Sequence, residues 1–128
     1  MRYIGLLVLL AALLAGCAAS EAPSAETLPP GDAGRGSALF TQAVNGAPAC
    51  STCHTLDGTT LVGPSLQGYA SRAGTRVANL SADAYTYESI ARPPAHLVEG
   101  FGNAMYAQYA RALTPQQFAD LIAYLLSL

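Results

Sequence analysis

The chain has 128 residues, which is room for one domain. Six arginines and no lysine stand against eight carboxylates, so the formal net charge is −2 at pH 7. Proteins that bind nucleic acid carry a basic patch, which this composition does not supply, and nucleic acid is therefore excluded as a partner.

The first 16 residues have the layout of an export signal peptide and are expected to lie outside the fold. A positive start precedes an unbroken apolar run from Ile4 to Leu14, which is short for a membrane span. The segment Leu14-Ala15-Gly16-Cys17 resembles the lipobox of bacterial lipoproteins. This resemblance implies a lipid-anchored Cys17 on an exported protein, in the periplasm or on the outer face of the cytoplasmic membrane. An ordinary signal peptide and an uncleaved anchor helix are the alternatives.

Residues 17–30 are predicted to form a flexible membrane tether. The segment is rich in alanine, serine, proline and glutamate and lacks apolar periodicity. Fourteen such residues have a typical end-to-end distance of about 20 Å and reach at most roughly 45 Å. The folded domain is therefore predicted to comprise residues 31–128 and to stay close to the membrane surface.

Three amphipathic helices are predicted within this domain. The first follows the capping residue Asp32 and ends at Asn45-Gly46, and the second runs from Ser81 to Pro93-Pro94. The third begins at Thr114 with a capping box. Its core-facing stripe has apolar residues at helical spacing, namely Phe118, Leu121, Ile122, Leu125 and Leu126.

No strand pattern of period 2 persists, and the loops between the predicted helices are long and rich in glycine. We therefore predict an all-α fold of three to five helices with long loops. Such loops are unusual in so small a domain unless a large group fills its core.

The segment Cys50-Ser51-Thr52-Cys53-His54 is a C-x-x-C-H motif, the attachment signature of c-type haem. Two residues between the cysteines let both sulfur atoms reach one edge of the porphyrin, and the adjacent histidine then lies under the iron. A redox dithiol of thioredoxin type needs a βαβ context, which the sequence lacks, and a zinc site needs a fourth ligand. We therefore predict one haem c, attached through Cys50 and Cys53, with His54 as an iron ligand.

The sixth iron ligand must come from a residue downstream of this motif. Met105 is the only methionine besides Met1, and it lies in a glycine-rich stretch without helical pattern. A lone methionine often fills a core, but such a stretch has the freedom to bring a thioether onto the iron. We predict Met105 as the ligand. His96 is the alternative, and a bis-histidine site would have a lower reduction potential.

Across residues 31–128 the sequence resembles the class I (monohaem) cytochrome c family. The segment Val62-Gly63-Pro64-Ser65-Leu66 matches the family segment whose proline carbonyl accepts a hydrogen bond from the proximal histidine. The resemblance implies that the small fold wraps around one haem, and that Gly36 and Phe40 cross the last helix near Tyr124. Haem propionates need donors, and the loop where such donors are expected contains Tyr69 and Arg72.

Two segments, Tyr87 to Pro93 and Val98 to Phe101, carry a finer resemblance. They are similar to cytochrome c domains fused to subunit II of haem-copper oxidases and to the monohaem lipoprotein subunit of alternative complex III. Those domains usually have a proline directly after the ligand methionine, whereas Tyr106 follows Met105 in this chain.

A six-coordinate haem iron that alternates between the ferrous and ferric states needs no catalytic base, nucleophile or open iron site, so we predict an electron carrier that is not an enzyme by itself. It would serve a membrane redox complex, either a quinol-oxidising complex or a terminal oxidase, in a respiratory or photosynthetic chain. A soluble electron carrier is a further expected partner. The alternative function is a haem-based sensor or small peroxidase with a displaceable sixth ligand.

Overall fold

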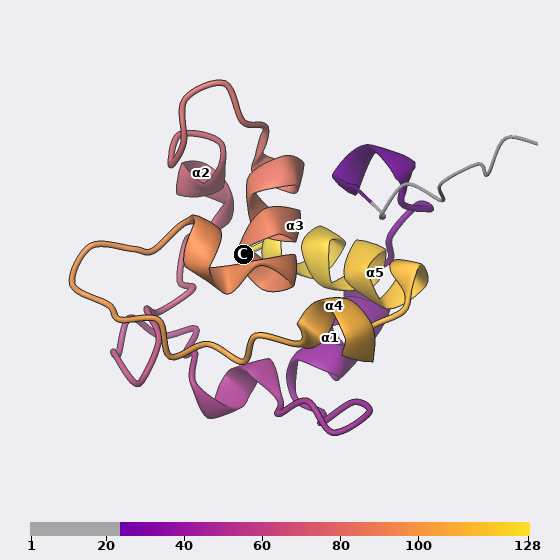
Figure 1. The fold of residues 1–128 in the computed structure, drawn as a ribbon, viewed down its shortest axis with the longest axis horizontal. Helices are drawn as coiled ribbons and strands as arrows, with labels where there is room; N and C mark the ends of the chain where they lie inside the picture. Colours follow the sequence, from indigo (N-terminus) through magenta and orange to yellow (C-terminus); the bar gives the residue numbers. More distant parts are fainter. Residues whose placement is uncertain (1–23) are drawn as a thin grey trace, which may run out of the picture.

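The computed structural model describes residues 24–128. Over this range five α-helices and three 3-10 helices follow one another as η1 (Ala25–Thr27), α1 (Ala33–Phe40), η2 (Cys50–Thr52), α2 (Ala70–Ala73), α3 (Ala82–Ala91), η3 (Pro93–Ala95), α4 (Tyr109–Ala112) and α5 (Pro115–Leu125) (Figure 1). The same residues contain no β-strand beyond one isolated bridge. The predicted all-α fold of three to five helices with long loops is confirmed. None of these helices is long and apolar enough to span a bilayer.

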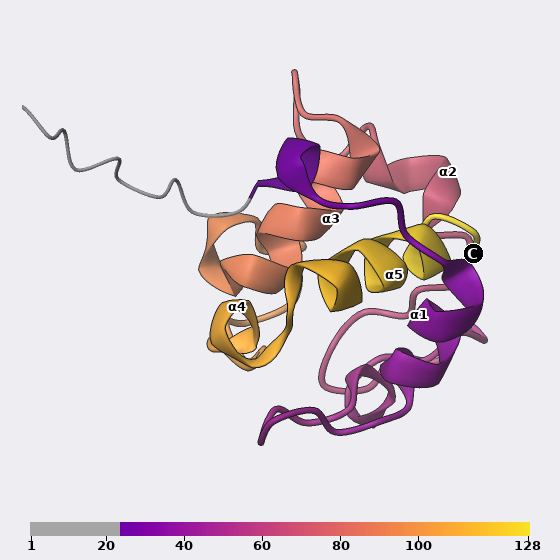
Figure 2. The ribbon, with the colours of Figure 1, turned by 90° about the vertical axis from the view of Figure 1, so that its right-hand side faces the viewer.

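Helices α1 and α5 pack against each other (Figure 2). Gly36 permits this contact, because a Cβ atom at its position would lie 2.7 Å from the Cβ of Tyr124 and would overlap the carbonyl group of Asp120. The rings of Phe40 and Tyr124 then pack with their centroids 5.6 Å apart. The crossing implied by the family resemblance is therefore present.

Helix α1 is shorter than predicted, since it ends at Phe40 rather than at Asn45-Gly46. Val44 and Ala47 instead exchange backbone hydrogen bonds of 3.1 and 2.9 Å around those two residues. Asn45 and Gly46 have φ values of 49° and 84°. A two-residue turn of this kind needs positive φ at both central positions, which asparagine and glycine adopt at the lowest cost. The pair therefore makes a tight turn of its own, separate from the end of the helix.

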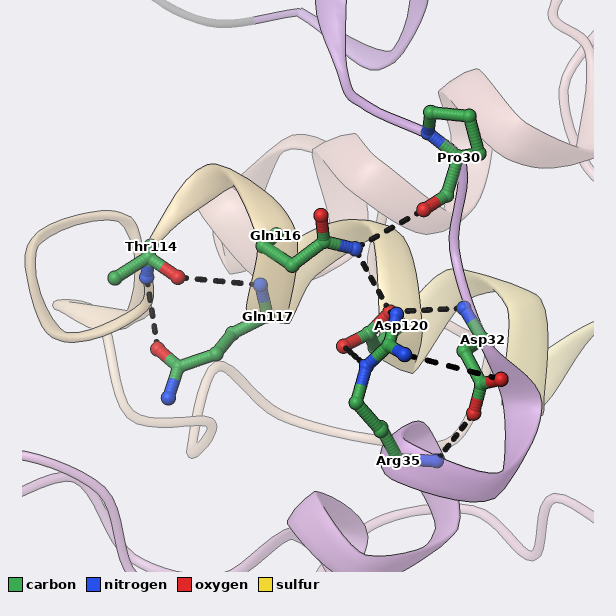
Figure 3. Close-up of polar contacts among 7 residues, drawn as sticks. All are labelled: Pro30, Asp32, Arg35, Thr114, Gln116, Gln117 and Asp120. Atoms are coloured by element: carbon green, nitrogen blue, oxygen red, sulfur yellow. Dashed lines mark hydrogen bonds and ion pairs between the residues drawn. The ribbon is translucent and has the colours of Figure 1, made fainter.

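The other two predicted helix starts are confirmed. Ser81 accepts a hydrogen bond of 3.1 Å from the backbone N–H of Ala84 at the start of α3. At the start of α5, Thr114 and Gln117 form both hydrogen bonds of a capping box, at 3.2 and 2.9 Å (Figure 3). These local bonds satisfy N–H groups that would otherwise have no partner in the helix.

Residues 24–30, predicted as the end of the tether, lie against the domain in the structure. The 3-10 helix η1 contacts α3, and Leu28 packs against the hydrophobic core. The Pro30 carbonyl accepts a hydrogen bond of 3.0 Å from the Gln116 side chain (Figure 3). Leu28 thus packs on the domain although it belongs to the predicted tether. The signal segment, Cys17 and the rest of the tether lie outside the described residues.

Candidate functional site

The C-x-x-C-H segment forms one tight turn that faces a cavity. The backbone N–H groups of Cys53 and His54 both donate to the Cys50 carbonyl, at 3.1 and 3.0 Å. This turn brings the two thiols and the imidazole to the wall of the same cavity. Neither thiol is in a disulfide. Burial raises the pKa of the Cys50 thiol, which is therefore protonated at neutral pH.

The segment that follows fixes the orientation of the His54 ring. Its Nδ1 atom lies 2.8 Å from the carbonyl oxygen of Pro64. A carbonyl only accepts, so Nδ1 carries the hydrogen and Nε2 keeps its lone pair. Gly63 makes room for the ring, because a Cβ there would lie 2.8 Å from Nδ1 and 3.0 Å from Nε2. The hydrogen bond that the resemblance implies for Pro64 is present, and the Nε2 lone pair is free to bind iron.

A cavity of about 390 Å³ lies between the C-x-x-C-H turn, α3, α5 and the long segment before α4. Figure 1 shows this last segment, in orange, bowing outward from the helices. Much of the cavity wall is apolar, with Leu66, Ile90, Leu121 and Leu125 among the lining side chains. All seven residues predicted to contact the cofactor lie on this wall, namely Cys50, Cys53, His54, Pro64, Tyr69, Arg72 and Met105.

Met105 reaches the cavity from the non-helical segment between η3 and α4. The chain turns at Gly100, which has a φ of 85°, and the Phe101 N–H donates to the Val98 carbonyl at 3.0 Å. Met105 is half-buried and packs against the hydrophobic core. The segment therefore presents the thioether to the same cavity that His54 lines.

Tyr106 stands where related domains usually have a proline, and it anchors the loop in another way. Its ring packs edge-on against the ring of Tyr109, with centroids 5.2 Å apart. The Tyr109 hydroxyl in turn donates a hydrogen bond of 2.8 Å to the Pro48 carbonyl, close to the C-x-x-C-H turn. This chain of contacts ties the residue after Met105 to Pro48, which also lines the cavity.

His96, the alternative sixth ligand, lines the same cavity. Its Nε2 atom lies 2.7 Å from Oε2 of Glu88. Its ring packs on Tyr85, with centroids 5.7 Å apart. The structure thus brings both candidate ligands to one cavity, and Nε2 of His96 is already bonded to a carboxylate.

Tyr69 and Arg72 lie on the cavity wall, but their donors have partners within the protein. Thr86 gives its hydroxyl hydrogen to the Ala82 carbonyl at 2.7 Å, so the Tyr69 hydroxyl must donate to Thr86 across 2.9 Å. Burial raises the pKa of Tyr69 to about 12. The Tyr69 hydroxyl hydrogen is thus used within the protein, and the role of Tyr69 toward a propionate stays a prediction. Arg72 donates to two carbonyl groups of residues 65–67 and keeps further N–H groups.

Two polar residues on the cavity side of α3, Thr86 and Ser89, were not predicted from the sequence. The Ser89 hydroxyl is buried and has no hydrogen-bond partner among residues 24–128. A buried hydroxyl without a partner costs about 1–3 kcal/mol, so its position indicates a group that fills the cavity. Helical spacing could have indicated this position, because Ser89 follows Tyr85 by four residues and so lies on the same face of the helix.

These observations fit a covalently bound haem. The apolar wall suits a porphyrin, two free thiols lie within one turn, and His54 offers a lone pair. Within residues 24–128 no three histidine, cysteine or acidic side chains gather to hold a metal ion by themselves. In a haem site the iron would be held by the porphyrin together with axial side chains.

A sequence model of the family described as Cytochrome c matches residues 33–128, which is 96 of the 128 residues. The match runs from the start of α1 to the last residue and includes every side chain that lines the cavity. No curated protein matches the sequence. Proteins of this family bind one haem c through cysteines, which Cys50 and Cys53 supply in this chain. The chain therefore belongs to the cytochrome c family and is a haem-based electron carrier.

Proposed function

We propose that this cytochrome c is a membrane-tethered carrier of single electrons whose haem iron is bound by His54 and Met105. The supporting observation is that both side chains line one cavity together with the two thiols, while the His54 Nδ1–H is held by Pro64. When bound, haem supplies an iron that alternates between the ferric and ferrous states. A His/Met pair raises the reduction potential of such a centre.

Contacts beside the cavity hold His54 in place. Pro64 fixes the tautomer and orientation of His54, and this bond makes the imidazole a stronger ligand. Arg72 binds two carbonyl groups of the loop that carries Pro64, one of them at 2.8 Å. The chain thus supplies a preformed site that needs little rearrangement when an electron arrives or leaves.

The membrane location is proposed from the sequence. Cys17 stands at the end of a lipobox-like segment, and an anchor there would hold the protein on the outer face of the cytoplasmic membrane. The segments Tyr87 to Pro93 and Val98 to Phe101 support membership of a respiratory or photosynthetic complex. The absence of lysine favours a permanent subunit over a shuttle that docks by long-range attraction. Its partners would be a quinol-oxidising complex or a terminal oxidase, and a soluble electron carrier.

The axial ligands are tested by optical spectra of the purified haem protein and of Met105→Ala, with His96→Ala as the matched control. We expect the oxidised wild type and the control to show the weak sulfur-to-iron band at the red end of the visible spectrum. Met105→Ala should lose this band. A wild type without the band would contradict Met105 ligation, and rapid binding of CO to its reduced form would favour a sensor or peroxidase.

The anchor is tested by the mass of the N-terminal peptide and by the fractionation of Cys17→Ser. We expect a mature chain that begins at an acylated Cys17, and a variant released from the membrane fraction. Detergent extraction should also recover a larger redox complex. A stable monomer without partners after mild extraction would contradict the subunit proposal and leave the anchor itself intact.

A further inference from the structure

Two side chains that line the cavity besides His54 could bind the haem iron. Met105 presents a thioether and His96 presents an imidazole. Imidazole is a good ligand for iron, and a second histidine would produce a low-potential site. The chain contains no lysine and only two histidines. Besides His54, His96 is therefore the one side chain that could offer the iron an imidazole or amine nitrogen in place of the Met105 thioether.

Glu88 on α3 holds His96 by the outer nitrogen of its ring. Oε2 of the carboxylate lies 2.7 Å from Nε2, with only 26% and 19% of the two side chains exposed. A carboxylate only accepts, so Nε2 carries a hydrogen whether the imidazole is neutral or charged. The neutral ring then has its lone pair on Nδ1, the nitrogen nearer the backbone. Nε2 of His96 cannot bind iron until it leaves Glu88.

Two further contacts restrain this pair. Oε1 of Glu88 lies 3.0 Å from Nη2 of Arg92, one helical turn further along α3. The His96 ring packs on the ring of Tyr85, which belongs to the same helix. The carboxylate and the imidazole are therefore each held by a second group, and both restraining groups come from α3 or its end.

We infer that Glu88 is a positioning residue that withholds His96 from the iron and thereby leaves the sixth position to Met105. This inference rests on the proposed ligation by His54 and Met105, and it adds the reason why the thioether prevails over the imidazole. Loss of the carboxylate frees the outer nitrogen of His96, which then competes for the iron from within the same cavity.

The inference is tested on the haem-loaded protein by comparing Glu88→Ala with Glu99→Ala, an exposed carboxylate in the following loop. We expect Glu88→Ala to lose at least half of the sulfur-to-iron band and to shift to a lower reduction potential. Glu99→Ala should keep both. The double variant Glu88→Ala/His96→Phe keeps a ring beside Tyr85, and it should regain the band. If Glu88→Ala does not mature, Glu88→Leu takes its place, because it preserves packing and lacks the acceptor.

The outcomes separate the two claims. A wild type without the sulfur-to-iron band contradicts the proposed Met105 ligation. A wild type with the band, and a Glu88 variant that keeps all of it at an unchanged potential, overturns the inference alone. A band that is lost in the Glu88 variant and does not return in the double variant also overturns it, because Glu88 would then act on the fold of α3 and not through His96.

Discussion

Gly36 lies where α1 touches α5, and the contact leaves no space for a side chain. Gly36→Ala would place a methyl group 2.7 Å from the Cβ of Tyr124 and in overlap with a backbone carbonyl. We expect the haem-loaded variant to lose about 2–3 kcal/mol of unfolding free energy, measured by guanidinium denaturation. Gly34→Ala in the same helix is the control, since its Cβ meets only a carboxylate oxygen at 3.2 Å. Its unfolding free energy should change by less than about 1 kcal/mol. Equal losses would contradict the role of close packing.

Gly63 plays a comparable part beside the haem ligand. In Gly63→Ala the new methyl group would push against the His54 ring and weaken its hydrogen bond to Pro64. Because this bond strengthens the imidazole as a ligand, we expect the reduction potential to rise, as measured by spectroelectrochemical titration. Gly102→Ala is the control in the other wall of the cavity, since no atom lies within 4 Å of its Cβ. A potential unchanged in both variants would argue against this tuning.

At the scale of elements, Asp120 joins the start of α1 to α5 (Figure 3). Its carboxylate accepts hydrogen bonds of 2.8 Å from the Asp32 backbone and from two nitrogens of Arg35, and one of 2.9 Å from Gln116. Only 3% of the Asp120 side chain is exposed. The bonds to Arg35 are the main cause that lowers the pKa of Asp120 to about 2. The ionised carboxylate is thus part of the joint between the two helices.

Because this joint needs the ionised carboxylate of Asp120, we expect the protein to lose stability in acid. The pKa of Asp120 is depressed in the folded state from its ordinary 3.8. The ionised carboxylate therefore contributes fully to the free energy of unfolding above pH 3.8, and this contribution disappears as the pH falls through about 2. Between about pH 5 and pH 2 we expect the wild type to lose about 2 kcal/mol more than Asp120→Asn, from denaturation curves at several pH values. Exposed Glu99→Gln should retain the wild-type slope. Parallel curves for wild type and Asp120→Asn would refute the assignment.

The helices that sequence patterns predict are those with local signals. The start of α5 depends on hydrogen bonds between Thr114 and Gln117, three residues apart, and it is found where predicted. Helices α2 and α4 have four residues each and no cap from a side chain. Tertiary contacts support them, such as the bond of 3.1 Å from the Ala70 N–H to the Leu128 carbonyl. Contacts between residues far apart in the sequence leave no local sequence pattern, so these two helices were not predicted.

The same distinction applies to the site. The C-x-x-C-H turn and Met105 can be recognised from residue type and spacing, and both lie on the cavity. The partner of Tyr69 could not be predicted, because it depends on how α3 packs against a loop 17 residues away. The hydrogen bond between Glu88 and His96 could not be predicted either, because it depends on the turn at η3 that folds the chain back onto α3.

In the whole molecule, the haem cavity takes the place of a large part of the core. An empty cavity of about 390 Å³ would cost up to roughly 9 kcal/mol at about 24 cal/mol per Å³. Small domains have about 5–15 kcal/mol of stability in total. We therefore expect the haem-free chain, made in a host that cannot attach haem, to show reduced helix content in circular dichroism and no cooperative unfolding. A sharp transition like that of the haem protein would contradict this account.

The packing of residues 24–30 against the domain changes how far a lipid anchor at Cys17 would let the haem travel. Seven residue steps join Cys17 to Ser24 and span at most about 25 Å, against roughly 45 Å for the fourteen residues of the whole predicted tether. For a flexible tether the volume open to the domain grows with about the 3/2 power of the number of residues, so halving this number reduces the volume roughly threefold. The effective concentration of the haem beside a partner within reach rises by the same factor. The length of the tether would then influence which proteins exchange electrons with this cytochrome.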